Sequence, residues 1–252
     1  MTYPHLSEQR ILITGAAARV GKTVACHLAQ QGCALAIHYR SSEDSARQMR
    51  QEFHERGVDC EIFQADLSEF DALADLVDRA EEALGPLTGL INNAAIWHPT
   101  PFKEVELDDW NQFFDINLRA PFFLAQRFAQ IASGRPHAQL INMVDIFARR
   151  PLTEYAPYGM TKAALHYMTE VLAAELATDI RVNGIAPGVV LLSDDDDPDE
   201  DEALQKLEQN IPLGFRGSPE DVAQTIAFLL GGPAYITGEV IAVDGARRHI
   251  TV

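Results

Sequence analysis

The sequence has few cysteines and no long hydrophobic run. Its 252 residues include three cysteines, Cys26, Cys33 and Cys60, whose spacing fits neither a CxxC motif nor a Cys/His zinc pattern. No apolar stretch approaches the roughly 18 residues of a membrane-spanning helix. The first ten residues lack a basic start followed by an apolar core. We therefore expect no metal site and no membrane partner, and a location in the reducing cytoplasm.

Positive charge is also scarce. Lys and Arg number 20 against 37 Asp and Glu, which gives a formal net charge of -17. Such a chain repels polyanions, so nucleic acid is not an expected partner. Part of the excess lies in "DDDDPDEDE" at 194–202, which we interpret as a solvated loop within an acidic substrate-loop insertion at about 189–212.

Short apolar runs alternate with longer amphipathic ones along the chain. Several short runs are apolar almost throughout, as in a parallel sheet that is covered on both faces. No linker or repeat divides the sequence. We predict one α/β domain over 1–252, a Rossmann-like doubly wound parallel sheet of about seven strands with helices on both faces. The expected strands are 10–14, 34–39, 60–65, 89–92, 139–144, 180–186 and 239–243, and the expected helices are 19–31, 43–56, 69–84, 108–133, 155–178 and 219–230.

A glycine-rich turn, "TGAAARVG", follows the first predicted strand. Gly15 and Gly21 would let the backbone approach phosphate oxygens, and the next helix offers free N–H groups there. The pattern is not GxGxxG and is weak by itself. A plain strand-to-helix turn explains the glycines but not Arg19 between them, which could meet a pyrophosphate or an anionic edge of a substrate.

The second predicted strand ends in "HYRSS" at 38–42. NAD enzymes usually place an acid near here for the ribose 2′-hydroxyl, whereas Arg40, Ser41 and Ser42 suit a 2′-phosphate. The sequence therefore favours NADPH, and the alternative is an exposed arginine before ordinary capping serines. After the third strand, Asp66 in "ADLS" could bind an adenine amino group or cap the next helix.

A tyrosine and a lysine, Tyr158 and Lys162, stand four residues apart in "YGMTK". On a helix they share one face, about one turn apart. A nearby ammonium stabilises a phenolate and lowers the pKa of the tyrosine, so the phenol becomes a better acid near neutral pH. The pair alone is weak, because a packed tyrosine and a surface lysine would look the same.

The motifs occur together and in a familiar order. "TGAAARVG", "ADLS", "NNAA", "INLRAP", "YGMTK", "RVNGIAPG" and "YITGEVIAVDG" resemble the short-chain dehydrogenase/reductase family over nearly the whole chain. The resemblance implies a nicotinamide cofactor and usually a homotetramer. It implies that Tyr158 donates the proton, that Lys162 holds the nicotinamide ribose and lowers the pKa of Tyr158, and that Asn117 anchors a water. The further expected cofactor contacts are Val20, His38, Tyr39, Leu67, Asn93, Ala94, Ala95, Met143, Pro187 and Gly188.

The chain departs from that family at Asp145, where most members have a serine that polarises a substrate carbonyl. An ionised carboxylate only accepts hydrogen bonds and would repel a forming alkoxide. The pteridine reductase branch does carry aspartate here, and "NMVDIFARRPL", "GAAARVG" and "HYRSS" are similar to that branch. Its members reduce C=N bonds of pterin or folate rings with NADPH. A carboxylic acid, or a water held by a carboxylate, can protonate the ring nitrogen.

Trp97, in "NNAAIWHPTP", lies where the branch has an aromatic side chain that sandwiches the pterin. Stacking a flat ring on an indole would contribute about 1–3 kcal/mol by analogy with nucleic-acid bases. The alternative is a tryptophan that packs under a loop. The resemblance also implies that Arg19 contacts both cofactor and pterin. Tyr155 either lines the pocket or only packs, and we expect His38 and His98 in loops or at the surface.

The sequence thus predicts an NADPH-dependent pteridine reductase whose substrate-binding residues are Arg19, Trp97, Asp145 and Tyr158. The nearest alternative is a carbonyl reductase of the same family, such as a 3-oxoacyl-carrier-protein reductase with an unusual aspartate. A non-catalytic NADP-binding protein is the third, and the intact catalytic positions argue against it. As a lid, the acidic run would repel the glutamate tail of folates and favour unconjugated pterins. In the tail "VDGARRHITV", Ala246 replaces the family's second glycine, which could alter a subunit contact.

Overall fold

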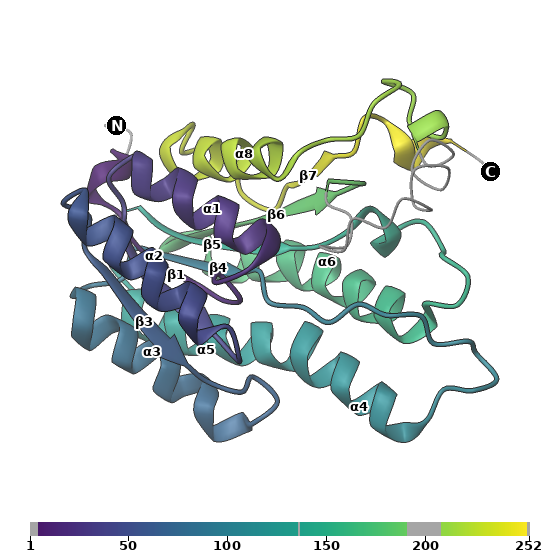
Figure 1. Cartoon of the computed structure of the whole chain (residues 1–252), viewed down its shortest axis with the longest axis horizontal. Helices are drawn as coiled ribbons and strands as arrows, with labels where there is room; N and C mark the ends of the chain where they lie inside the picture. Colours follow the sequence, from purple (N-terminus) through teal and green to yellow (C-terminus); the bar gives the residue numbers. More distant parts are fainter. Residues whose placement is uncertain (1–4, 136, 191–207, 251–252) are drawn as a thin grey trace.

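Seven parallel strands form one sheet in the order β3-β2-β1-β4-β5-β6-β7, with helices on both faces (Figure 1). The computed structural model describes residues 5–135, 137–190 and 208–250. The strands are β1 Arg10–Ile13, β2 Ala34–Tyr39, β3 Cys60–Gln64, β4 Gly89–Asn92, β5 Ala138–Met143, β6 Ile180–Pro187 and β7 Val240–Val243. The predicted fold class is confirmed, and each strand lies within about one residue of its predicted range.

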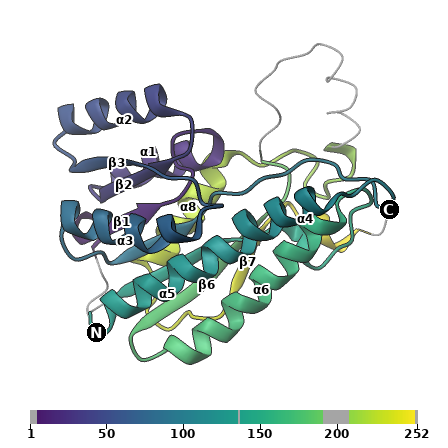
Figure 2. The same ribbon diagram turned by 90° about the horizontal axis from the view of Figure 1, so that it is seen from below.

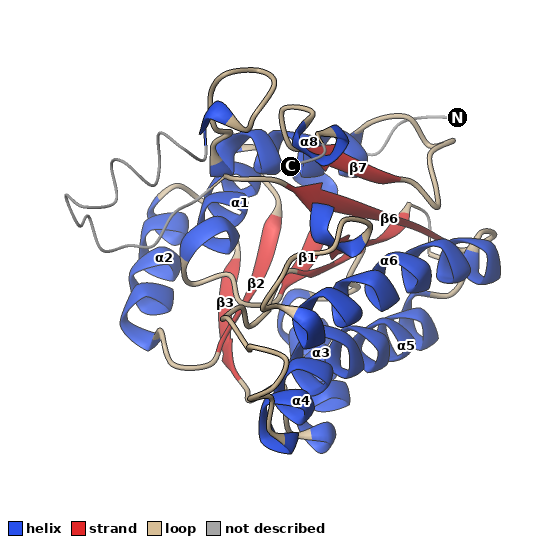
Figure 3. Cartoon of the chain, turned by 90° about the vertical axis from the view of Figure 1, so that its right-hand side faces the viewer, coloured by secondary structure: helices blue, strands red, loops and turns tan. Residues whose placement is uncertain are grey.

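The apolar runs form strands because both faces of the sheet are covered. Every residue of β4 and β5 is buried, as continuous apolar runs at the centre of a parallel sheet require. One helical layer contains α1, α2 and α8, and the other contains α3, α5 and α6, with the sheet between them (Figures 2 and 3). The bounds are α1 Arg19–Gln30, α2 Glu43–Glu55, α3 Phe70–Leu84, α5 Ala120–Ala132, α6 Ala156–Leu176 and α8 Pro219–Gly231.

The helix predicted over 108–133 is interrupted. It consists of α4 (Leu107–Phe114), a π-helical turn over Asp115–Arg119 and α5. A π turn inserts an extra residue and re-aims the side chains in it, and such turns are frequent at functional sites. The apolar pattern of the sequence did not reveal this interruption. Asn117, one of the predicted catalytic residues, lies in this turn.

Part of the predicted substrate loop lies outside the described residues. The acidic run at 194–202 falls outside the described residues, as does the rest of the predicted 189–212 insertion between 191 and 207. Within the described ranges, no helix is both long and apolar enough to cross a membrane. In that same part of the chain, no cluster of His, Cys, Asp and Glu is placed to hold a metal ion.

Candidate active site

The predicted catalytic residues meet beyond the carboxyl end of β5, where doubly wound sheets bind their ligands. Asp145 follows β5 and begins a short 3-10 turn, Ile146–Ala148, by accepting the backbone N–H of Phe147 on Oδ1 at 2.8 Å. Its second oxygen, Oδ2, accepts the hydroxyl of Tyr158 from α6 at 2.6 Å. The two groups that the sequence placed thirteen residues apart are therefore joined by a short hydrogen bond.

The two groups perturb each other's ionisation. Burial raises the pKa of Asp145 above its usual range, and the hydrogen bonds from Phe147 and Tyr158 oppose that rise. Burial and then the neighbouring Asp145 charge raise the pKa of Tyr158 well above its usual range. The net pKa of Tyr158 is therefore raised and not lowered, with burial the largest cause and the Asp145 charge the next. The predicted stabilisation of a Tyr158 phenolate by Lys162 stays a prediction. Tyr158 therefore stays protonated, and Asp145 is the member of the pair whose charge can change.

Lys162 is buried, with 3% of its surface exposed. Its Nζ donates to the carbonyl oxygen of Met143 at 2.7 Å and lies 5.7 Å from the centroid of the Tyr158 ring. Burial lowers the pKa of Lys162 to about 8, against the opposing effect of Asp145. The ammonium thus lies over the Tyr158 ring and links α6 to Met143, the last residue of β5. Its predicted contact with a ribose stays a prediction.

Asn117 holds the chain segment that carries Trp97. Its Oδ1 accepts the N–H of Ile96 at 2.9 Å, and its Nδ2 donates to the carbonyl oxygen of Ile96 at 3.0 Å. Nδ2 also lies 3.4 Å from the hydroxyl of Thr161 on α6. The side chain therefore fixes the segment after β4 against the catalytic helix. Its predicted role as the anchor of a water stays a prediction.

Trp97 and Tyr155 form an aromatic wall beside this site. Their rings stack with centroids 4.8 Å apart and an interplanar angle of 18°. Tyr155 is held by a backbone bridge between Thr100 and Tyr155 and by the N–H of Thr100, which donates to Glu154 at 2.6 Å. Trp97 is 55% exposed. One face of the indole is thus covered by Tyr155, while more than half of the surface of Trp97 remains exposed.

Thr14 and Asn93 shape the glycine-rich turn. The buried Thr14 hydroxyl accepts the N–H groups of Asn93 at 2.9 Å and Ala94 at 3.0 Å. The Asn93 amide donates to the carbonyl oxygens of Thr14 at 2.8 Å and Gly15 at 3.1 Å. A Cβ at Gly21 would collide with the Gly15 carbonyl and with the Asn93 amide. Close backbone packing therefore requires a glycine at position 21. The sequence pattern alone did not distinguish this explanation from phosphate binding.

His38 is buried, with 2% of its surface exposed, so the expectation that it lies in a loop or at the surface is wrong. Its Nδ1 accepts the N–H of Gly15 at 3.0 Å, and its Nε2 is 3.1 Å from the carbonyl oxygen of Ala65. A neutral ring protonated on Nε2 satisfies both contacts. His38 thus joins the ends of β1, β2 and β3 beneath the turn. Its direct contact with a cofactor stays a prediction.

Replacing His38 with glutamine should remove part of the acid sensitivity of the fold. Burial is the largest cause that lowers the pKa of His38 to about 4, against about 6.5 in an unfolded chain. Between these values the unfolded state binds a proton that the folded state does not, so acidification lowers the free energy of unfolding by about 3 kcal/mol through this group. Urea unfolding of the wild type and H38Q across this pH window measures the difference.

The same exchange at exposed His5 is the matched control, since that ring is at the surface and should not change the pH slope. Equal pH slopes for the wild type and H38Q would show that His38 does not resist protonation.

The two arginines that were predicted to bind phosphate groups are both exposed. Arg19, which has a left-handed φ of 51°, and Arg40 are both exposed, and no carboxylate in the described part of the chain pairs with either guanidinium. Asp66 accepts the N–H and the hydroxyl of Ser68 on a single oxygen, Oδ1, at 2.9 and 2.7 Å. Helix α3 begins later, with Glu69 before it, so Asp66 holds a turn and does not cap that helix. Among the described residues no hydrogen bond to its Oδ2 is formed, and its contact with an adenine amino group stays a prediction.

The other predicted cofactor contacts gather at the same edge of the sheet. Tyr39, Leu67 and Met143 are buried, so a cofactor would reach chiefly their backbone. A Cβ at Gly188 would lie 2.9 Å from Cα of Asp244, which shows how closely the segments after β6 and β7 approach. The remaining predicted contacts, Val20, Ser41, Ser42, Ala94, Ala95 and Pro187, are partly buried or exposed.

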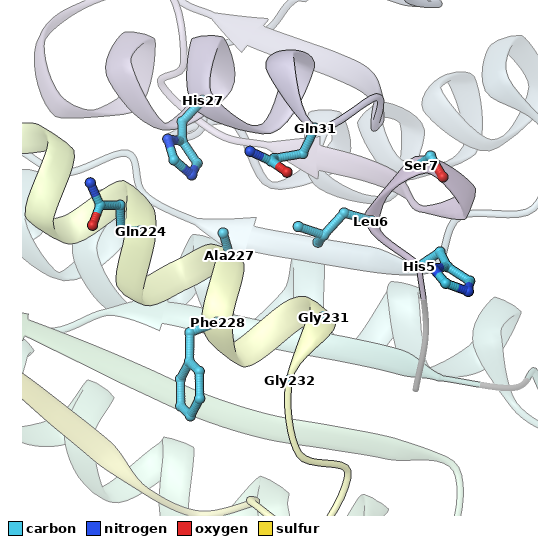
Figure 4. A pocket seen from close by; sticks show the side chains of 10 residues that line it. All are labelled: His5, Leu6, Ser7, His27, Gln31, Gln224, Ala227, Phe228, Gly231 and Gly232. Atoms are coloured by element: carbon cyan, nitrogen blue, oxygen red, sulfur yellow. The ribbon is translucent and has the colours of Figure 1, made fainter. Parts of the chain in front are cut away.

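An open hollow of about 620 Å³ lies elsewhere, between α1, α8 and the 3-10 turn Leu6–Glu8 that precedes β1 (Figure 4). Its lining includes His27 and Gln31 near the end of α1, and Gln224 and Phe228 of α8. These residues lie toward the amino ends of the strands and include none of the predicted site residues. The size of this hollow therefore does not identify it as the active site.

Comparison with known proteins places the chain among reductases. The sequence profile described as enoyl-(acyl carrier protein) reductase matches residues 15–246. The 3-oxoacyl-[acyl-carrier-protein] reductase FabG of Staphylococcus aureus is 31% identical over 236 residues, which are 93% of this chain and 96% of that protein.

Solved structures give a second view. FolM alternative dihydrofolate reductase 1 from Brucella canis, complexed with NADP, is 27% identical with a TM-score of 0.90, over 98% of this chain and 97% of that one. A blue fluorescent protein from a metagenomic library, in complex with NADPH, is 32% identical with a TM-score of 0.87, over 96% and 98%.

Proposed function

Since the chain belongs to the short-chain dehydrogenase/reductase family, we propose that this oxidoreductase reduces pterin rings with NADPH. The observation that carries the proposal is the carboxyl group of Asp145, which accepts the Tyr158 hydroxyl at 2.6 Å. A carboxylate beside the proton donor would repel the alkoxide that forms when a ketone is reduced. Reduction of a C=N bond forms no oxyanion and needs a proton on nitrogen.

The chain's own residues account for that proton. When bound, NADPH supplies a hydride to the carbon of the C=N bond. Tyr158 donates its hydroxyl proton to the ring nitrogen. Asp145 in its protonated form, or a water held by its carboxylate, then returns a proton to the phenol, and solvent restores the proton that is lost. The raised pKa of Asp145 lets this carboxyl group carry a proton nearer to neutral pH than an exposed aspartate does. Lys162 stays charged below pH of about 8 and stabilises negative charge on the phenol.

The residues present fit the cofactor. The glycine-rich turn that begins at Gly15 leads into the amino-terminal end of α1, and the amino-terminal ends of helices bind phosphate groups. Arg40 stands at the end of β2 with Ser41 and Ser42 beside it, and it has no carboxylate partner among the described residues. A 2′-phosphate would supply that partner. The complexes of two structural relatives with NADP and NADPH support the same cofactor for this chain.

The exposure of Trp97 beside this site supports a flat ring as the substrate. The indole lies on the segment that Asn117 fixes against α6, and one of its faces is covered by Tyr155. The likeness to an alternative dihydrofolate reductase adds to the same interpretation. We propose dihydropterins as the substrate class, with dihydrobiopterin preferred and dihydrofolate less favoured if the acidic run repels its glutamate tail.

A second candidate is the reduction of 3-oxoacyl thioesters. The observation in its favour is the 31% identity with an acyl-carrier-protein reductase over 93% of this chain. Asp145 would then be a tolerated change at the position of the family's serine. A third candidate, an NADP-binding protein without activity, has less support because Tyr158, Lys162 and Asn117 are all placed around one site.

The purified protein should oxidise NADPH when dihydrobiopterin is added. Parallel reactions with dihydrofolate and with a short 3-oxoacyl thioester compare the candidates, and each is repeated with NADH. We expect turnover of a pterin but not of the thioester, and a higher kcat/KM for NADPH than for NADH. Turnover of the thioester alone would refute the pterin proposal, and a preference for NADH would refute the role of Arg40.

Assembly and location are proposals as well. The family resemblance supports a homotetramer. Cys26, Cys33 and Cys60 are all unpaired, which suits a reducing compartment, so we propose the cytoplasm as the site of action.

A further inference from the structure

The last turn of the chain lies against the turn that holds Asp145. The guanidinium carbon of Arg247 is 5.9 Å from the centroid of the Phe147 ring, and the backbone N–H of Phe147 is the group that binds Oδ1 of Asp145. In Figure 1 the yellow segment after β7 lies on the same side as the tips of the strand arrows. A residue about a hundred positions away in sequence thus contacts the turn that binds the carboxyl group of Asp145.

Polar contacts hold this tail in place. The Arg150 guanidinium donates to the carbonyl oxygen of Arg247 at 2.6 Å. The carboxylate of Asp244 accepts the N–H groups of Ala246 at 3.0 Å and Arg248 at 2.8 Å. Arg247 is therefore anchored through its own carbonyl group and through both of its neighbours in sequence, which leaves its side chain free to serve another purpose.

The backbone conformation just before Arg247 also helps to place its side chain. Ala246 has a left-handed φ of 69° and precedes the 3-10 turn Arg247–His249. A non-glycine residue in that region costs about 1 kcal/mol, and such strain persists only where the surrounding contacts impose it. The left-handed residue turns the chain so that the guanidinium of Arg247 faces Phe147.

The charges around Arg247 are mixed. Arg247 is half-buried, and no carboxylate in the described ranges forms an ion pair with its guanidinium. The charged groups that affect it are Asp145 and Asp244, which favour its charged form, and Arg150, which disfavours it. From the other side, Asp145 is influenced by two cations, Lys162 on α6 and Arg247 on the tail. Arg247 is thus the one that comes from outside the predicted catalytic residues.

We propose that Arg247 is a positioning residue for Asp145: it stabilises the ionised carboxylate and holds the Phe147 turn that orients it. What Asp145 then does in catalysis rests on the proposed function, but the effect of Arg247 on its charge does not. Removing the cation removes a stabilising charge from the carboxylate, so Asp145 will bind its proton at a higher pH. The direction is the same whether the ionised or the protonated carboxyl group is the active form.

The test is the titration of Asp145 in the full-length protein with no substrate present. The carboxylic acid C=O band of Asp145 is followed by infrared spectroscopy across pH and is assigned by its disappearance in D145N. In R247M the midpoint should move to higher pH than in the wild type. In R247K, which keeps a positive charge, it should move less or not at all. R150M keeps the Arg247 charge but loses the anchor, so an intermediate shift is expected.

An unchanged midpoint in R247M, or equal shifts in R247M and R247K, would overturn the proposal. Thermal unfolding of each variant identifies any loss of the fold, in which case R247K and R150M still decide the outcome. If a pterin is turned over, the limb of the kcat/KM profile that reports Asp145 should move in the same direction. A shifted titration without pterin turnover would refute the proposed function while leaving the role of Arg247 intact.

Discussion

Replacing Asp145 with serine should lower kcat/KM for a dihydropterin by about 10²–10⁴-fold, the range lost with a positioned acid or base. Serine is too short and too weak an acid to supply the proton that the carboxyl group provides. It also lacks the carboxylate oxygen that accepts the Tyr158 hydroxyl. D145N separates charge from shape, because the amide keeps an acceptor oxygen but cannot carry the proton. We expect D145N to lose nearly as much activity as D145S.

The matched control is D59S, since Asp59 is exposed directly before β3, at the opposite end of the strand from the site. The variants are compared by NADPH oxidation with the pterin and the 3-oxoacyl thioester. Full pterin activity in D145S would remove the main support for the proposed function. A gain of thioester reduction in D145S would favour the carbonyl reductase, because the family's serine would then have been restored.

Replacing Lys162 with methionine should also lower kcat/KM by about 10²–10⁴-fold. The buried ammonium is the cation behind the Tyr158 phenol, and its loss leaves negative charge on that phenol without support. The charge is also lost by titration, since burial lowers the pKa of Lys162 to about 8. Wild-type activity should therefore decline as the pH rises through that value. The pH profile of kcat/KM measures the decline.

Unfolding does not explain such a decline. With a folded pKa of about 8 and an unfolded value of about 10.4, the unfolded state binds more protons between these values. This group therefore makes the fold more stable as the pH rises. K103M is the control, since Lys103 is exposed and its loss should leave the profile unchanged. Undiminished activity well above pH 8 in the wild type would show that Lys162 is not required in its charged form.

Short-range patterns were enough to predict much of the fold. Apolar runs such as "QLINMV" predict strands because a parallel sheet buries both of their faces, and β5 is buried at every residue. The alternation with amphipathic helices indicated the topology, because crossovers in such sheets have one preferred hand. The π turn at Asn117 was not predictable from short-range patterns. Its Asn117 side chain makes hydrogen bonds to Ile96, twenty-one residues away in the sequence.

The sequence by itself determined which residues could carry the chemistry, namely the Tyr158–Lys162 pair, the aspartate in place of a serine, and the arginine after the second strand. Only the tertiary structure decided how these groups affect one another. Tyr158 donates to Asp145 at 2.6 Å, His38 is buried under the glycine-rich turn, and Arg247 reaches the Phe147 turn. The physical reason is that ionisation depends on burial and on nearby charges, and both are set by contacts between residues far apart in the chain.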